Sequence, residues 1–231
     1  MRAAPKLGTL PLLPPPQPRD WTETEFGNTP LNDVRLTRRL QVLARDFYAR
    51  PQANIPQACG SAASIKAAYR FFDHPDTTMD TLLTAHYAAT VQRCQSQHVV
   101  LAVQDTTSLN YTTHPATLGL GPIASQADGA TGLIVHDTLA FSPEGTPLGL
   151  VDVQCWAPDP QTFGKSAQRH ALPIEQKESF KWLTSFAAAS RAQQQCPNTT
   201  WVSVGDREAD VYELFTQAAA DPHGTQRSRF C

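Results

Sequence analysis

Two aspartates, Asp105 and Asp206, each follow a short apolar run that is typical of a buried strand. Asp105 follows Val99–Val103 within a Gln-Asp-Thr-Thr motif, and Asp206 follows Trp201–Val204 and opens an Asp-Arg-Glu-Ala-Asp motif. Carboxylates are the oxygen ligands with which proteins hold a divalent metal beside a phosphodiester. The sequence therefore predicts a metal-dependent site at the ends of two strands, provided that the fold brings these strands together.

The same residues allow other interpretations. An aspartate after a strand is also common at the start of a helix, so Asp206 can simply cap the helix that follows it. The Gln-Asp-Thr-Thr motif invites comparison with phosphatases that use an aspartyl nucleophile, but these have a second aspartate where this chain has Thr107. His114 and His136 have no His, Cys or carboxylate at a helical ligand spacing, so we expect core or loop histidines at both positions.

The second half of the chain contains the elements that would position the two aspartates. We expect strands at Val99–Val103, Leu133–Phe141 and Leu148–Trp156, a turn at Pro143–Pro147, a polar loop at Pro158–Pro173, a helix at Glu175–Gln195 with Phe180, Leu183 and Phe186 inward, a strand at Trp201–Val204 and a helix at Ala209–Ala220. This is the opening order of a ribonuclease-H-like α/β fold, in which the ends of the first and fourth strands lie side by side. The agreement between element order and aspartate placement supports this fold class.

The first half of the chain predicts helices. Apolar residues recur at helical spacing from Asn32 to Arg50 and from Ser61 to Phe72, and a further helix is expected at Thr78–Cys94. Basic side chains are expected on the outer faces or flanks of the first two helices, namely Arg35, Arg38, Arg39, Lys66 and Arg70. They are either ordinary solvated side chains or a basic patch that contacts DNA phosphates.

Composition limits the class of protein. The chain of 231 residues has a net charge of −2, so any DNA binding must come from a local patch. Five scattered cysteines without a Cys-x-x-Cys spacing argue against a disulfide framework and a thiolate zinc site. A reducing cytosol fits best, and no apolar run approaches the roughly 20 residues of a membrane span, so we expect a cytoplasmic protein without a membrane partner. Residues 1–20 are expected to be a disordered proline-rich tail, or a leader upstream of the true start.

Several motifs in one order resemble the bacterial insertion-sequence transposases of the "insertion sequence four" group, to which the transposon-five transposase belongs. The resemblance covers roughly Trp21 to His223. Its motifs are Trp21 with Glu25-Phe26-Gly27, Leu31-Asn32-Asp33 with Arg35-Leu36, Ile55-Pro56-Gln57-Ala58-Cys59, Lys66-Ala67-Ala68-Tyr69-Arg70-Phe71-Phe72, Gln104-Asp105-Thr106-Thr107 with Leu109-Asn110-Tyr111, Gly119-Leu120-Gly121, Lys177-Glu178-Ser179 with Lys181-Trp182, and Asp206-Arg207-Glu208-Ala209-Asp210.

The resemblance implies two domains. Residues 21–77 would be a helical domain that recognises double-stranded transposon-end DNA, and residues 78–231 would be the N-terminal part of a ribonuclease-H-like catalytic domain. Members of the group cut DNA with an Asp, Asp, Glu triad that binds two Mg²⁺ ions, for which Mn²⁺ can substitute. Asp105 and Asp206 match the two aspartates, and Arg207 would support the site and contact DNA. Intact members act as homodimers on DNA.

The chain departs from the group at its C-terminus. The group's catalytic glutamate, on a later helix within a Tyr, Arg, Glu, Lys signature, has no counterpart here, and the tail from Gly224 to Cys231 does not continue as an apolar strand. We therefore expect a truncated, inactive transposase with an incomplete sheet. The alternative is a DNA-binding fragment that occupies transposon ends and inhibits an intact transposase; a standalone metal nuclease is a weaker third hypothesis.

Overall fold

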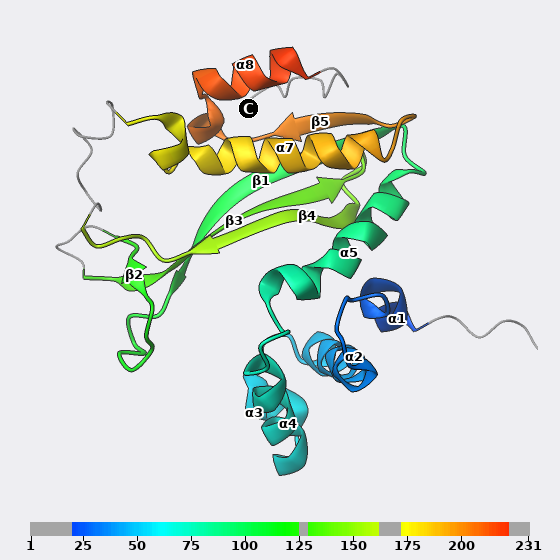
Figure 1. Ribbon diagram of the computed structural model, residues 1–231, viewed down its shortest axis with the longest axis vertical. Coiled ribbons are helices and arrows are strands. Elements are labelled where there is room, and N and C mark those ends of the chain that lie inside the picture. The colour runs from blue at the N-terminus through cyan, green and yellow to red at the C-terminus, as the bar shows by residue number, and fades with distance from the viewer. Residues whose placement is uncertain (1–19, 125–128, 162–171, 222–231) are drawn as a thin grey trace, which may run out of the picture.

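The computed structural model describes residues 20–124, 129–161 and 172–221. It is a mixed α/β protein in which an N-terminal group of helices is followed by a sheet with helices packed on one face (Figure 1). The expected proline-rich tail and the Gly224–Cys231 segment lie outside the described residues, as does most of the expected polar loop at Pro158–Pro173. The mixed α/β class with a helical N-terminal region is confirmed.

The helical unit consists of α1 (Trp21–Phe26), α2 (Val34–Ala49), α3 (Ile55–Cys59) and α4 (Ala62–Phe72). The predictions of α2 and α4 are confirmed, whereas α1 and α3 were not predicted because each is too short for apolar spacing to repeat. Polar caps fix the helix starts: the Asp33 carboxylate accepts a hydrogen bond from the Arg35 backbone N–H, and Ser61 accepts one from the Ser64 N–H. The core of the unit joins α2 to α4 through Leu40, Leu43, Ala68 and Phe71.

The sheet is built around β1 (Val99–Asn110) and β3 (Thr131–Phe141), which pair antiparallel. On the far side of β3 lies β4 (Pro147–Trp156), also antiparallel, and the short β2 (Gly121–Pro122) pairs with the start of β3. On the other side of β1 lies β5 (Thr200–Val204), which runs parallel to it. The expected strands are all present, and those predicted from 133 and 148 form the expected hairpin.

One expectation about β1 was wrong. The strand does not end at Val103 but continues to Asn110, so Asp105 lies within β1 rather than at its end. The reason is that β1 has two neighbours of different length: β5 pairs with it only as far as Val103, while β3 pairs with it as far as Asn110. The apolar run in the sequence marks the part of β1 that has a strand on both sides. Burial alternates regularly only up to Gln104, and the rest of the strand is mostly exposed.

Two helices pack against the same face of the sheet. They are α5 (Met79–Cys94), predicted correctly, and α7 (Phe180–Gln194), which crosses the sheet in Figure 1. Their side chains share one core with the strands, made by Cys94, Val91, Ala188, Ala189, Ala192, Cys196, Val100, Ala102, Ala140, Leu148, Val151 and Trp201. Beyond α7 lies α8 (Tyr212–Ala220), which packs on α7 through Leu214.

The start of α7 differs from the prediction. The segment before Phe180 forms a separate 3-10 turn, η1 (Ile174–Gln176), and the helix begins at Phe180. Phe180 is 37% exposed, although it was expected inward, whereas Trp182, Leu183 and Phe186 are buried. On a helix that buries Trp182 and Phe186, position 180 points to the opposite side, because consecutive residues are rotated by about 100°. The true anchor of this helix is therefore Trp182.

The described residues also show two general properties of the chain. No helix among the described residues is long and apolar enough to cross a membrane. Four of the five cysteines, Cys59, Cys94, Cys155 and Cys196, fall in the described part of the chain and are free thiols.

Candidate functional site

The parallel register of β1 and β5 brings the two acidic motifs to the same end of the sheet. Val103 pairs with Val204, and each aspartate lies two residues further along its own chain, Asp105 in β1 and Asp206 just beyond β5. Although 101 residues separate them in sequence (206 − 105), each lies two residues beyond the last parallel pair of β1 and β5. This is the juxtaposition that a shared site requires.

The two side chains also leave the same face of the sheet. Side chains alternate along a strand, so Asp105 shares the face of Val103, opposite to the buried Ala102 and Gln104. Beyond β5 the alternation continues, because a Cβ built on Gly205 would lie 2.7 Å from the Ala209 Cβ and 3.1 Å from the Trp182 ring, on the α7 side. Asp206, one residue later and in an extended conformation, therefore points to the face away from α7.

Each aspartate uses one oxygen locally. Asp105 Oδ1 accepts a hydrogen bond of 2.7 Å from the Thr106 backbone N–H. Asp206 Oδ1 accepts one of 2.8 Å from the Glu208 N–H and so caps η2 (Arg207–Ala209), the 3-10 turn that follows it. Asp206 therefore caps this short turn and not the helix expected at Ala209–Ala220, which begins at Tyr212 with Val211 as its N-cap. The second Asp206 oxygen has no part in this cap. Both side chains are exposed.

A third carboxylate on this face was not predicted as a site residue. Asp137 on β3 lies directly opposite Asp105 in the antiparallel register, so the two side chains share one face. Burial raises the pKa of the Asp137 carboxyl, and the negative charge of Asp105 raises it further. The sequence signal was present but weak, because Asp137 is the acidic residue of a strand in which His136 and Thr138 are also polar. Within the described residues, however, no three His, Cys, Asp or Glu side chains form a group that can hold a metal ion.

A buried polar layer lies under the two aspartates, on the α7 side of the sheet. Gln104 donates a hydrogen bond of 2.9 Å to the Ser203 hydroxyl and so joins β1 to β5. His136 is fully buried, its Nδ1 lies 2.8 Å from the Thr106 hydroxyl, and its ring meets Trp182 edge-on at 4.6 Å. This layer fixes the residues that flank Asp105 in sequence, which restricts the position of Asp105 itself.

His136 is a core residue, as predicted. Burial lowers its pKa to about 4, and the positive charge of Lys181 acts in the same direction. The charges of Asp105 and Asp206 oppose these effects and favour the protonated imidazole. The other histidine considered above, His114, lies in the loop after β1, where its ring packs against Tyr111. Neither histidine belongs to a metal-binding group among the described residues.

The buried side chain of Lys181, on α7, interacts with the segment that follows Asp206. The Lys181 side chain is only 6% exposed, and its Nζ lies 3.3 Å from Glu178 and 3.8 Å from Glu208. Glu208 therefore pairs with α7, whereas Arg207 is exposed and directed to solvent. This arrangement leaves Arg207 able to reach a ligand at the edge of the sheet.

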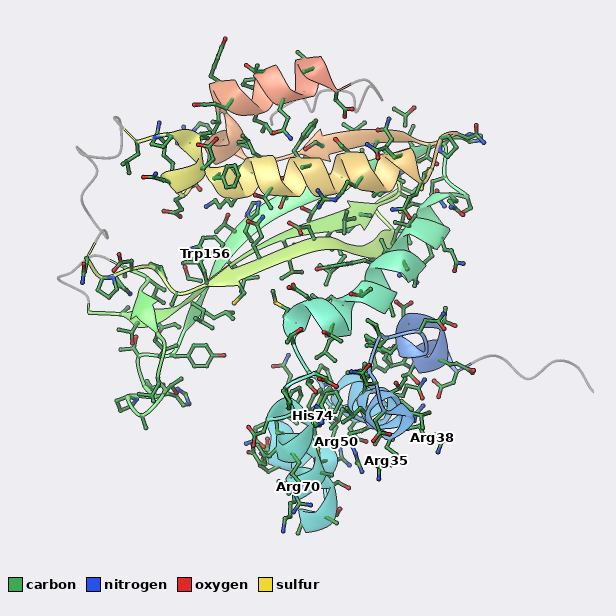
Figure 2. The ribbon with its side chains drawn as sticks, viewed as in Figure 1. Arg35, Arg38, Arg50, Arg70, His74 and Trp156 are labelled. Carbon is green, nitrogen blue, oxygen red and sulfur yellow. The ribbon has the colours of Figure 1, made fainter. Side chains whose placement is uncertain are left out.

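The basic residues predicted to bind DNA all lie in the helical unit, apart from Arg207. Arg38, Lys66 and Arg70 are exposed, and Arg39 is half-buried. The Arg35 side chain is 85% exposed but forms an ion pair of 2.7 Å with Asp33, whose pKa is lowered chiefly by its hydrogen bonds from Arg35. Figure 2 shows the labelled arginines of α2 and α4 on the part of the molecule that lies away from the sheet.

The two helices that carry these cations meet at the end where α2 begins and α4 ends. The Asn32 amide donates a hydrogen bond of 3.2 Å to Asp76, and the charge of His74 contributes to the lowered pKa of Asp33. Arg35 follows Asp33 closely, and Arg70 lies one helical turn before His74. Cations from two helices are therefore presented near one junction.

Two other arginines of the helical unit have structural roles. Arg45 on α2 forms an ion pair with Asp20 and donates a hydrogen bond of 2.9 Å to Thr22, which joins α1 to α2. Arg50 donates hydrogen bonds of 2.8 and 3.1 Å to the carbonyls of Gln57 and Ala58, which closes the end of α3. Not every arginine in the basic stretch is available to DNA.

A comparison with protein families gives a match within the N-terminal part of the chain. Residues 18–77 match the family described as "Transposase DNA-binding", and these residues contain α1 to α4 and all the basic residues predicted to bind DNA except Arg207. The match supports a transposase family and a DNA-binding role for the helical unit.

Proposed function

We propose that this protein is a DNA transposase of the insertion sequence four group, whose helical unit binds transposon ends and whose sheet is a ribonuclease-H-like catalytic domain. The observation that carries the proposal is the match of residues 18–77 to transposase DNA-binding domains. Support for the catalytic part comes from the parallel pairing of β1 and β5, which puts Asp105 and Asp206 on one face at one end of the sheet.

In this proposal the helical unit supplies affinity for double-stranded DNA. Exposed Arg38, Lys66 and Arg70 would neutralise phosphates, and Arg35 would do so by exchanging its ion pair with Asp33 for one with DNA. The unit contains nearly balanced charge between Trp21 and Thr77, with seven basic and six acidic residues. Binding therefore depends on where the cations are placed rather than on the net charge.

The acidic edge is suited to a hard divalent cation such as Mg²⁺ or Mn²⁺. Asp105 and Asp206 would hold the ion, because carboxylate oxygens are preferred ligands. Each side chain uses only its Oδ1 for a local hydrogen bond, so its Oδ2 would bind the ion. Bound there, the ion would supply Lewis-acid chemistry for attack on a phosphodiester. The chain's own residues would orient the DNA and the two carboxylates: the Gln104–Ser203 hydrogen bond fixes the strands, and the exposed Arg207, next to Asp206, would contact the DNA.

A second function is favoured by one specific observation. The described residues offer no group of three metal-binding side chains, whereas the proposed mechanism needs a third carboxylate to complete the ligand set. A chain that binds transposon ends without cutting them would occupy those ends and inhibit an active transposase. Proteins of the proposed group pair on DNA, so homodimerisation belongs to the same proposal.

One experiment separates binding from cleavage. The purified chain is used to select duplexes from a random-sequence DNA library, and the selected duplex is then incubated with Mg²⁺ or Mn²⁺. We expect selective, salt-sensitive binding with no strand cleavage, because loss of one ligand of a cooperating set costs orders of magnitude in rate. Cleavage that is abolished by Asp105→Ala would instead establish an active nuclease. The absence of any binding would overturn the transposase proposal.

A further inference from the structure

The junction between the helical unit and the sheet contains a small set of half-buried titratable side chains that the DNA-binding and acidic sites do not use. Glu25 on α1 reaches across to His86 and Arg93, which lie two turns apart on α5. Glu25 Oε2 lies 2.6 Å from His86 Nδ1, and Glu25 Oε1 lies 2.5 Å from an Arg93 guanidinium nitrogen. The Glu25 side chain is only 17% exposed, so these interactions are poorly screened by water.

The same two α5 side chains bind the outer edge of β4. The Leu150 backbone N–H donates a hydrogen bond of 3.0 Å to His86 Nε2, and Arg93 Nε donates one to the Leu148 carbonyl. These groups belong to an edge strand, whose outward N–H and C=O groups have no strand partner. Each α5 side chain therefore bridges two partners, the edge of the sheet on one side and Glu25 of the helical unit on the other.

The hydrogen-bond pattern determines where the His86 proton lies. Because Nε2 accepts from the Leu150 N–H, it cannot carry a hydrogen of its own. The neutral imidazole then carries its proton on Nδ1, which donates to Glu25. The hydrogen bond from the Leu150 N–H on the sheet edge therefore fixes the tautomer of His86. The Nδ1–H of that tautomer in turn orients the Glu25 carboxylate.

The backbone of β4 is shaped to admit this bridge. Gly149 lies between the two bonded residues with a φ of +135°, and a Cβ there would meet the Thr90 hydroxyl and lie 2.8 Å from Arg93. The pairing of β3 with β4 is also irregular at this point, between Thr138 and Leu139. The edge of the sheet thus departs from regular geometry where α5 docks.

We infer that Glu25, through His86 and Arg93, is the positioning residue that sets the orientation of the DNA-binding unit relative to the sheet. The helical unit ends at α4, and the chain then enters α5, whose Leu82 packs against the core of the unit. This apolar contact is non-directional, whereas the Glu25 bridge adds a directional polar connection through α1, supported by the stacking of Phe26 on His86 at 6.5 Å. The inference rests on the proposed function for what is positioned, namely bound DNA relative to Asp105 and Asp206.

The test measures orientation directly in the full-length chain. Spin labels are attached at Cys155, exposed on β4, and at Ala63→Cys, exposed on α4, after Cys59→Ser and Cys231→Ser remove the other reactive thiols. Pulsed dipolar spectroscopy then gives the distribution of the distance between the two units. We expect one narrow maximum in the parent chain and a broad or multiple distribution in Glu25→Ala. A distribution that is already broad in the parent, or unchanged in Glu25→Ala, would overturn the inference.

A matched control separates orientation from stability. Asp20 is the N-cap of the same short helix and also pairs with an arginine, but its partner Arg45 belongs to the helical unit itself. Asp20→Ala should lower the melting temperature while the distance distribution stays narrow. If Asp20→Ala broadens the distribution as much as Glu25→Ala does, α1 is only a structural element and the inference fails.

Two histidine variants test the direction of the bridge. His86→Asn keeps a donor at the Nδ1 position for Glu25, and His86→Gln keeps an acceptor at the Nε2 position for Leu150. We expect His86→Asn to keep a narrower distribution than His86→Gln, and the opposite order would contradict the bridge. Duplex DNA affinity, measured in parallel, should be similar in Glu25→Ala and the parent. If neither the parent chain nor any variant binds DNA, the proposed function fails. The distance distributions still test whether Glu25 sets the orientation of the two parts.

Discussion

Asp105 on β1 and Asp137 on β3 lie directly opposite each other, with both carboxylates on the face of the sheet that α5 and α7 leave uncovered. Like charges placed opposite each other across two strands destabilise a sheet. The pair is therefore a cost to folding, and this cost is seen in the pKa of the Asp137 carboxyl, which burial and the Asp105 charge raise above its ordinary value. Carboxyl groups with perturbed pKa values cluster at functional sites, which makes Asp137 a candidate member of the acidic site.

The first prediction concerns this pair. Asp105→Asn should lower the pKa of Asp137 toward the value of an unperturbed aspartate, because one of the two causes of its elevation is removed. A folded-state pKa that is raised means that Asp137 favours folding at low pH and loses this contribution as pH rises through the folded pKa. Carboxyl carbon chemical shifts measured by NMR during a pH titration would show the change. Asp206→Asn is the control, because Asp206 has no part in the Asp137 elevation.

The second prediction concerns acid stability. The pKa of His136 is about 4 in the folded protein and 6.5 for an ordinary histidine, so the unfolded chain binds a proton that the folded chain refuses between these values. The contribution of His136 is therefore present above pH 6.5 and is lost as pH falls toward 4. The loss amounts to about 3 kcal/mol.

Denaturant unfolding at several pH values would measure this effect. His136→Asn, which keeps a polar group near the Thr106 hydroxyl, should be less stable at neutral pH yet lose less stability between pH 7 and pH 4 than the parent chain. Equal losses in both proteins would show that His136 does not control the acid response. The comparison removes the effect of the surface carboxylates, which titrate in both proteins.

The third prediction concerns Arg35. Asp33→Asn should raise affinity for duplex DNA by about threefold to tenfold at low salt, since it frees Arg35 and removes a negative charge near the phosphates. The helix start should survive, because asparagine caps helices as well as aspartate. Fluorescence anisotropy over a range of salt concentrations would measure the affinity.

The double variant provides the check. If Asp33 acts through Arg35, then Asp33→Asn should give a much smaller gain in a chain that already carries Arg35→Ala. Arg35→Ala alone should weaken binding and reduce the salt slope by about one. An identical gain in both backgrounds would show that Asp33 repels DNA independently of Arg35, and a salt-independent affinity would remove the basic residues from the interface.

Much of this architecture could be predicted from the sequence because its signals are local. The apolar spacing of Leu36, Leu40 and Leu43 specifies α2, and short apolar runs specify the strands. The placement of Asp105 next to Asp206 required a further step, the parallel pairing of strands about a hundred residues apart, which only element order suggests. The position of Asp137 opposite Asp105 could not be predicted, because it depends on the register between β1 and β3. The bridge from Glu25 to His86 could not be predicted either, because it depends on how α1 packs against α5. No local pattern in the sequence specifies either arrangement.

The last prediction concerns Gly205, which sets the direction of Asp206. Gly205→Ala should reduce stability by about 1–3 kcal/mol, because the new methyl group would crowd the Ala209 Cβ and the Trp182 ring. Both neighbours are buried and cannot move aside easily, so the chain must shift and turn Asp206 out of line with Asp105. Binding of Mn²⁺, followed by electron paramagnetic resonance, should weaken along with stability.

A second-site variant makes this prediction specific. Ala209→Gly removes the closer of the two obstructing atoms, so the double variant Gly205→Ala with Ala209→Gly should recover part of the lost Mn²⁺ affinity. Ala209→Gly alone should bind Mn²⁺ as the parent does, since Ala209 carries no ligand atom. If Gly205→Ala destabilises the protein but leaves Mn²⁺ binding unchanged, then the direction of Asp206 does not matter for the ion, and the acidic edge would no longer be supported as its site.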